Sequence, residues 1–150
     1  YSNLAQRIRK ELDCNVYLID VDEGDEFLIE VGRRTHIPVI PMDIPLIPAA
    51  KILANARAYI SGRYHPSILA SLGGTPCVFM GSNSHKTTSI QELLQYETIK
   101  EYNVLPDDDE CSKIICDARE KINNRELRKT IKNRAYELCN EAKKIVEIIR

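Results

Sequence analysis

One stretch of the sequence decides the fold: Ile60-Ser-Gly-Arg-Tyr-His-Pro-Ser-Ile-Leu-Ala-Ser-Leu-Gly-Gly-Thr-Pro-Cys-Val-Phe-Met80. Its pattern predicts a strand, a tight turn at Gly62, and a helix that begins at Pro66 and runs through Leu72. Proline suits the first position of a helix, because its missing N–H is not needed there and its φ is already helical. Two glycines end that helix before the nearly continuous apolar run Pro76–Met80, which is typical of a strand buried on both faces of a parallel sheet.

Strand and helix patterns also alternate on both sides of this stretch. The expected elements are a helix over Leu4–Leu12, a strand over Asn15–Asp20, a helix over Asp25–Arg34, an extended segment over Ile37–Pro41, a helix over Ala49–Ala56, a strand over Ala58–Ser61, and a helix through about Tyr96 capped by Ser89 and Glu92. This alternation is typical of right-handed βαβ units. We therefore expect an α/β fold with a Rossmann-like open parallel sheet flanked by helices.

The chain is expected to end in two helices, at about residues 109–123 and 125–150. The acids Asp107, Asp108 and Asp109 suit the amino end of the first helix, because the helix dipole favours negative charge there. In the second helix, apolar residues recur at spacings of three and four, which predicts one stripe facing a core. The residues of this stripe are Leu127, Ile131, Ala135, Leu138, Ala142, Ile145 and Ile149.

The composition is that of one ordinary globular domain over residues 1–150. The chain is 43% hydrophobic and 29% charged, with a net charge of -1, so it has no basic field to draw it onto nucleic acid. No run approaches the ~20 apolar residues of a membrane span. The five cysteines form no Cys-x-x-Cys pair, which argues against a zinc knuckle, and Cys14 and Cys77 are expected to be buried thiols in a reducing compartment.

Arg63 and His65 are the principal candidates for a functional site. They emerge at the carboxyl end of a parallel strand, where open α/β sheets bind ligands, and beside a helix amino end that favours an anion. An arginine fork holds a carboxylate or phosphate at two points, and a histidine moves a proton near neutral pH. In the alternative interpretation, Arg63 pairs with a local acid and His65 caps the helix.

Other candidates are less specific. Lys86, at the end of the next strand, is either a second anion contact or an exposed loop lysine. Ser82 either binds a phosphate or sugar hydroxyl or makes turn hydrogen bonds. The acids between Asp20 and Glu26 lack the pattern of a calcium-binding loop, which indicates a solvated loop. His36 is expected at the surface.

The central stretch resembles the signature of the polysaccharide pyruvyl transferase family. Members carry an Ile-Ser-x-Arg-x-His turn, a helix of small and apolar residues, a Gly-x-Pro entry into a strand, and then a loop with a lysine. Here these elements are Ile60, Ser61, Arg63, His65, Ala70, Leu72, Gly74, Pro76 and Lys86. The resemblance is sharp over about residues 57–95, looser back to Leu4, and weak beyond Asn103.

The resemblance implies a transferase that moves a pyruvyl group from phosphoenolpyruvate onto two hydroxyls of a sugar, giving a cyclic ketal in cell-surface glycan synthesis. Arg63 would carry the donor's anion, and His65 would bind the donor or shuttle protons. Ser67, Ser82 and Lys86 complete the expected donor-binding set. The scheme needs no metal or cofactor. The acceptor would be a glycan or a lipid-linked sugar.

The family's fold is similar to the two-domain glycosyltransferase-B arrangement, and the chain matches its carboxyl-terminal half. Together with a start at Tyr1, this predicts a missing amino-terminal domain and a fragment that folds but does not catalyse. The expected location is the cytoplasm, with peripheral attachment at the inner face of the membrane as a variant.

Two alternatives stay open. The His65-Pro66 pair resembles that of some sialyltransferases and polysialyltransferases of similar fold, which hold a nucleotide phosphate, so the donor is either phosphoenolpyruvate or a nucleotide sugar. The second alternative is a non-catalytic binding module with a degenerate donor pocket.

Overall fold

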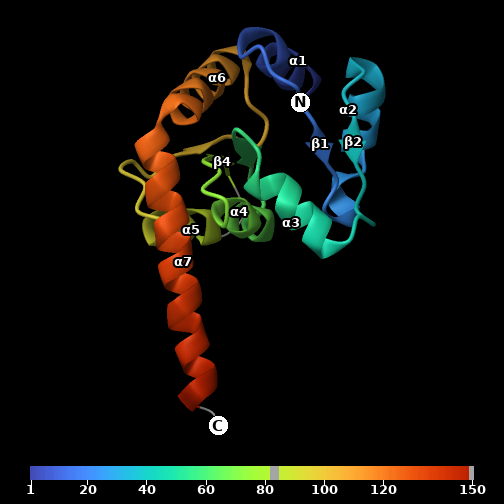
Figure 1. The fold of residues 1–150 in the computed structure, drawn as a ribbon. Coiled ribbons are helices and arrows are strands. Elements are labelled where there is room, and N and C mark those ends of the chain that lie inside the picture. Colours follow the sequence, from blue (N-terminus) through green and yellow to red (C-terminus); the bar gives the residue numbers. More distant parts are fainter. Residues whose placement is uncertain (82–84, 149–150) are drawn as a thin grey trace.

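The computed structural model describes residues 1–81 and 85–148, with side chains described through Lys144. Helices and short strands alternate along the chain, as the sequence predicts, before two long helices close it (Figure 1). The elements are α1 (Ser2–Glu11), β1 (Leu18–Ile19), the 3₁₀ turn η1 (Glu23–Asp25), α2 (Phe27–Thr35), β2 (Val39–Ile40), α3 (Leu46–Ala54), β3 (Tyr59–Ser61), α4 (Tyr64–Ser71), β4 (Cys77–Met80), α5 (Lys86–Leu93), β5 (Glu101–Tyr102), α6 (Asp108–Asn123) and α7 (Arg125–Ile148).

All described strand pairs are parallel, which confirms the predicted α/β fold with an open parallel sheet. The ladders fall into two groups, β1 with β2 and then β3, β4 and β5 in that order. In the first group Leu18 lies opposite Val39, and in the second Ile60 lies opposite Val78. Within each group, neighbouring strands therefore follow one another in the order of the chain.

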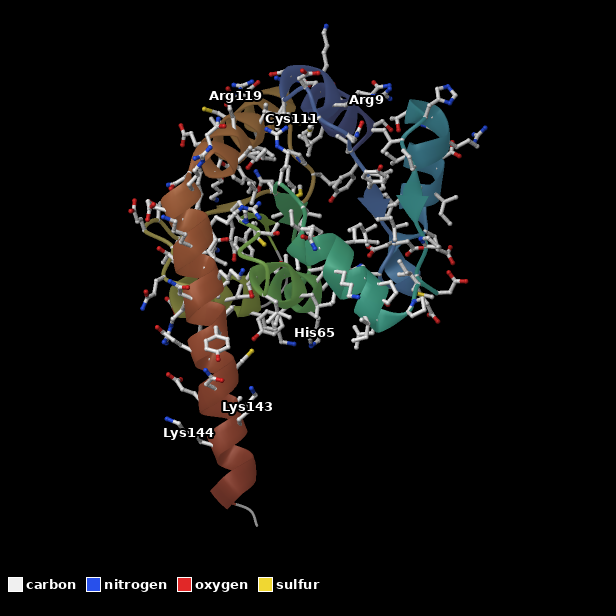
Figure 2. All side chains as sticks on the ribbon, viewed as in Figure 1. Arg9, His65, Cys111, Arg119, Lys143 and Lys144 are labelled. Atoms are coloured by element: carbon white, nitrogen blue, oxygen red, sulfur yellow. The ribbon has the colours of Figure 1, made fainter. Side chains whose placement is uncertain are left out.

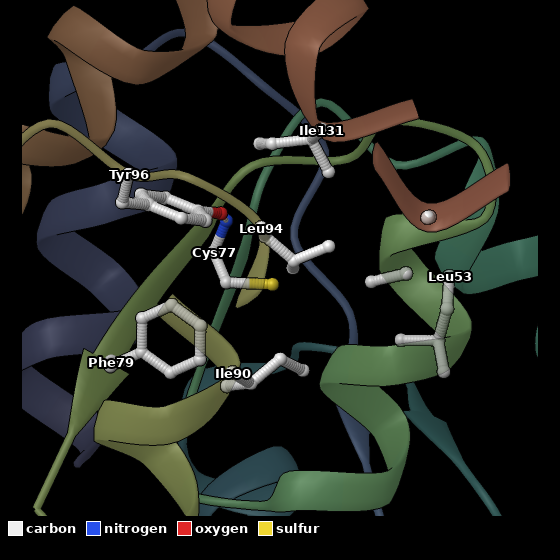
Figure 3. Packing of buried hydrophobic residues seen from close by; sticks show 9 residues of the cluster. Leu53, Cys77, Phe79, Ile90, Leu94, Tyr96 and Ile131 are labelled. Atoms are coloured by element: carbon white, nitrogen blue, oxygen red, sulfur yellow. Dashed lines mark hydrogen bonds between the residues drawn. The ribbon is translucent and has the colours of Figure 1, made fainter. Parts of the chain in front are cut away.

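Strand β4 lies at the centre of two hydrophobic cores, because successive side chains of a strand point to opposite faces. Cys77 and Phe79 belong to a cluster with residues of α4, α5 and α7 (Figure 3). Val78 and Met80 belong to a second cluster with residues of α1 and α6. All four residues are buried, so the prediction of a strand covered on both faces is confirmed.

The first core also contains a polar contact that fixes β4. The Cys77 backbone N–H donates a hydrogen bond of 2.8 Å to the Tyr96 hydroxyl, which points at it in Figure 3. The Tyr96 ring packs edge-on against Phe79, with 5.7 Å between ring centroids. Tyr96 thus satisfies a buried donor and fills the core at the same time.

The two predicted terminal helices are present as α6 and α7. Asp107 caps α6 by accepting a hydrogen bond of 2.8 Å from the Glu110 N–H. Ile131 and Ala135 of α7 are buried, but Ala142 is exposed. The described part of the predicted stripe therefore faces the core along the first part of α7, and the helix continues past the rest of the fold (Figure 1). The predicted stripe positions Ile145 and Ile149 lie outside the residues whose side chains the structure describes. No described helix is long and apolar enough to cross a membrane.

Several helices begin earlier than predicted, and for α4 and α5 the difference bears on the site. Helix α4 begins at Tyr64, with Arg63 as its N-cap residue, so Pro66 is the third helical residue. The N–H of that position has no intrahelical partner either, and proline fits there equally well. Helix α5 begins at Lys86, so the predicted Ser89–Glu92 capping box is wrong.

A tertiary contact explains the early start of α5. The Thr87 and Thr88 hydroxyls both donate to the Glu101 carboxylate, at 2.5 and 3.2 Å, and this ties the first turn of α5 to β5. Strand β5 is only two residues long and was not expected from the sequence. The remaining predicted elements are present with shorter or shifted ends, and β1 covers only part of the predicted Asn15–Asp20.

Candidate functional site

A cavity of about 480 Å³ lies at the carboxyl ends of β1 and β3. The polar residues that line it come from the segments after these strands, namely Asp20, Asp22, Arg63 and His65. Apolar residues from β2, the following loop and α3 also line it, namely Ile40, Met42, Ile44, Leu46 and Ile52. Both strands belong to parallel ladders, and open α/β sheets bind ligands outside the carboxyl ends of such strands.

Glycine at position 62 lets the chain turn from β3 into α4 beside the cavity. A Cβ atom there would lie 2.9 Å from the backbone oxygens of both Met80 and Gly81. The end of β3 therefore passes too close to the end of β4 for any side chain. The predicted turn at Gly62 is confirmed, and the close approach to β4 explains why the residue there is glycine.

Arg63 is held by acids that follow β1. Its Nη2 atom lies 2.5 Å from Asp25 Oδ1 and its Nη1 atom lies 3.2 Å from Asp22 Oδ2. The Asp25 side chain is 10% exposed, whereas that of Asp22 is 62% exposed. The hydrogen bond with Asp25 is the largest cause that raises the pKa of Arg63, so its guanidinium keeps its charge.

These ion pairs bear on both interpretations of Arg63. It pairs with local acids, as the alternative interpretation expects, and it also lines the cavity, as an anion site requires. The acid loop is thus not merely solvated, because Asp25 is buried against Arg63. Arg63 meets one buried and firmly placed carboxylate and one exposed carboxylate at a longer distance.

His65 is the second residue of α4 and is exposed at the cavity (Figure 2). Its ring contacts that of Tyr64 edge-on, with 5.5 Å between centroids. Arg63, not His65, is the N-cap residue of the helix, and no side-chain capping bond is present there among the described residues. The structure thus gives no support to a capping role for His65.

Two of the remaining predicted site residues, Ser67 and Lys86, are not among the described residues that line this cavity. Ser67 is buried, and its hydroxyl donates a hydrogen bond of 2.7 Å to the Arg63 backbone oxygen. Lys86 is exposed as the first residue of α5 and is not among the described residues that line the cavity. Ser82 lies outside the residues that the structure describes.

Sequence reasoning missed Asp20 as a site residue. Its backbone N–H donates a hydrogen bond of 3.0 Å to the Ile40 backbone oxygen. Asp20 therefore lies directly after β1 and beside the end of β2. Its Oδ1 atom is buried and has no hydrogen-bond partner among the described residues. The sequence signal for Asp20 was its position at the carboxyl end of a predicted parallel strand. The carboxyl ends of β1 and β3 meet at one edge of the fold, where a ligand site is expected.

The acid loop does not form a metal centre. Across residues 1–81 and 85–148 there is no group of three or more His, Cys, Asp or Glu side chains placed to hold a metal ion. Asp22 instead caps η1 by accepting from the Glu23 N–H at 2.9 Å, and Asp25 pairs with Arg63. The loop's observed role is to position the arginine.

Comparison with protein families gives a match. The sequence model of a family described as polysaccharide pyruvyl transferase matches residues 1–84, a range that includes Asp20, Asp22, Asp25, Arg63 and His65. No curated protein and no solved structure matches the chain.

Proposed function

The chain belongs to the polysaccharide pyruvyl transferase family, a family of transferases, and from this premise we propose that its cavity binds phosphoenolpyruvate and transfers the pyruvyl group to two hydroxyls of a sugar. The observation that carries the proposal is the meeting of Arg63 and His65 at one cavity, within the residues that match the family. An anion-binding fork and a proton carrier are the two groups that this reaction requires.

Arg63 binds the donor's anion in this proposal. Asp25 holds the guanidinium in place, and the incoming carboxylate or phosphate displaces the exposed Asp22 from Nη1. The displacement costs little, because an exposed ion pair contributes only about 0–1 kcal/mol. The free N–H groups in the first turn of α4 add to the attraction for the anion.

His65 delivers a proton to the methylene carbon of phosphoenolpyruvate. It lies two positions beyond Arg63, in the first turn of the same helix, so a donor held by Arg63 lies within its reach. Protonation of that carbon leaves an oxocarbenium-like centre at the neighbouring carbon. The apolar wall of Ile40, Ile44 and Ile52 shields this centre from water.

The acceptor in this proposal is a glycan or a lipid-linked sugar, and a second, amino-terminal domain completes the site. Ser67 supports the site indirectly, through its hydrogen bond to the Arg63 oxygen. The roles of Lys86 and Ser82 in donor binding stay predictions. The proposed reaction takes place in cell-surface glycan synthesis, at the cytoplasmic face of the membrane.

The test uses the full-length protein with phosphoenolpyruvate and saccharides that carry two neighbouring hydroxyls. We expect release of inorganic phosphate together with a pyruvyl ketal product detected by mass spectrometry. Arg63→Ala should lower kcat/KM by about 10–150-fold, the equivalent of about 1.5–3 kcal/mol for a hydrogen bond to a charged group. The matched control is Arg57→Ala, since Arg57 is exposed and does not line the cavity. Transfer from a nucleotide sugar, with phosphoenolpyruvate untouched, would contradict the proposal.

A further inference from the structure

Asp20 presents a hydrogen-bond acceptor that the fold leaves unused. Its Oδ1 atom is buried and unpartnered among the described residues, although the residue lines the cavity. A buried acceptor without a partner destabilises a folded protein, so folds rarely retain one without a use. An aspartate that serves the fold alone would be expected to satisfy both oxygens.

The arginine that lines the cavity is already engaged by other acids. The described bonds of the Arg63 guanidinium go to Asp22 and Asp25, from the same loop. Asp20 therefore lines the cavity as a further carboxylate beside a locally balanced charge cluster. The Asp20 carboxylate repels the phosphate or carboxylate of a ligand and attracts a ligand group that donates a hydrogen bond.

The chemistry that suits this acceptor is a hydroxyl group. Phosphoenolpyruvate carries a carboxylate and a phosphate and has no hydroxyl to offer, whereas the sugar must present two. A hydroxyl donates one hydrogen bond to a carboxylate, and a carboxylate that receives it is placed to take the proton. Asp20 thus offers the hydroxyl of the acceptor sugar a hydrogen-bond acceptor in the same cavity that Arg63 and His65 line.

We propose that Asp20 is a catalytic base that binds the attacking hydroxyl of the acceptor sugar and takes its proton; the inference rests on the proposed pyruvyl transfer. As the hydroxyl oxygen forms its bond to C2 of phosphoenolpyruvate, its proton passes to the Asp20 carboxylate. The electron pair of the C2–C3 double bond takes a proton from His65 at C3.

The second half of the reaction restores both groups. The bond from C2 to the phosphate oxygen breaks, and the electron pair leaves with the phosphate, which takes the proton from Asp20. The second hydroxyl bonds to C2 and returns its proton to His65. One phosphoenolpyruvate and one diol thus give one ketal and one hydrogen phosphate, with no oxidant or reductant.

The decisive variant is Asp20→Asn in the full-length protein, which keeps the shape of the side chain and removes its basicity. We expect kcat for pyruvyl transfer to fall by about 10²–10⁴-fold, the usual contribution of an acid–base group. Binding of phosphoenolpyruvate, measured by calorimetry, should be unchanged or tighter, because a negative charge is removed from the cavity. The melting temperature should be unchanged or higher.

The matched control is Glu23→Gln, which removes a carboxylate from the same loop at an exposed position that does not line the cavity. It should keep the wild-type kcat. If the Asp20→Asn protein is insoluble, Asp20→Ser provides the same comparison. A wild-type kcat in the Asp20 variant would overturn the role of Asp20 but not the proposed function. The same holds for a lower kcat that comes with weaker phosphoenolpyruvate binding and a lower melting temperature. A wild-type protein that consumes no phosphoenolpyruvate would overturn the proposed function, and this inference with it.

Discussion

Asp25, at the end of η1, forms an ion pair with Arg63, the N-cap residue of α4, with 2.5 Å between Asp25 Oδ1 and Arg63 Nη2. The pair joins the two groups of parallel strands at the edge of the cavity, although its members are 38 positions apart. Arg63 thus links the two groups of strands, in addition to the anion-binding role that we propose for it.

The ion pair between Asp25 and Arg63 should stabilise the folded protein. Asp25→Asn should lower the free energy of unfolding by about 1–2 kcal/mol, less than the 3–5 kcal/mol of a fully buried pair because Arg63 is 39% exposed. Arg63→Ala should have a similar cost, since it leaves Asp25 buried and unpaired. In urea denaturation, the double variant should be more stable than the sum of the two single effects implies. Additive effects would contradict the coupling.

Asp22 should act against donor binding. The exposed Asp22 side chain places its Oδ2 atom 3.2 Å from Arg63 Nη1. An anionic ligand that binds Nη1 must displace this carboxylate. Asp22→Asn should therefore tighten the binding of phosphoenolpyruvate about 1.5–5-fold in low-salt calorimetry, the equivalent of about 0.2–1 kcal/mol for a surface ion pair. The gain should shrink at high salt, because salt screens exposed charges. Weaker binding in the variant would mean that Asp22 contacts the ligand favourably.

Stability should fall in alkaline solution. Burial raises the pKa of the Cys77 thiol to about 12 and that of Tyr59 to about 12. An unfolded thiol ionises near about 8.5, so above that pH the unfolded state loses a proton that the folded state keeps. The Cys77 contribution is therefore fully present below about pH 8.5 and declines by about 1.4 kcal/mol per pH unit above it. Unfolding free energies between pH 7 and 10 should show this slope, and Cys77→Ala should flatten it. Equal slopes for the two proteins would refute the assignment.

Helix α7 should stabilise the fold through its first part. Ile131 is fully buried there, and Ile131→Ala should cost about 2–5 kcal/mol. Tyr136 on the same helix is 68% exposed, and Tyr136→Ala should change stability by less than about 0.5 kcal/mol. Equal melting temperatures for the two variants would show that α7 does not pack as described.

Much of this fold could be predicted from local patterns. The apolar run Pro76–Met80 predicts a strand buried on both faces, and β4 has that burial because α1 and α6 cover one face and α4, α5 and α7 cover the other. The spacing of Leu127, Ile131 and Ala135 predicts the buried side of α7. These predictions succeed because the spacing of apolar residues along a short stretch of chain indicates which side of a helix or strand is buried.

Long-range contacts explain what local patterns miss. The start of α5 depends on Glu101, which accepts hydrogen bonds from the first turn of the helix and is distant in sequence. The predicted site contained Arg63 and His65 because both lie in one turn. It lacked Asp20 and Asp25, because their roles arise only when β1 and β3 are brought together at one edge.

The most direct test of the central claim is a calorimetric comparison of donors on the full-length protein and its Arg63 variants. The wild type should bind phosphoenolpyruvate more tightly than any cytidine or uridine nucleotide sugar. Arg63→Ala should weaken that binding by about 1.5–3 kcal/mol, and Arg63→Lys should restore it only in part, because an ammonium keeps the charge and loses the planar fork. Tight binding of a nucleotide sugar with none of phosphoenolpyruvate, or an Arg63→Ala protein that binds phosphoenolpyruvate normally, would contradict the account.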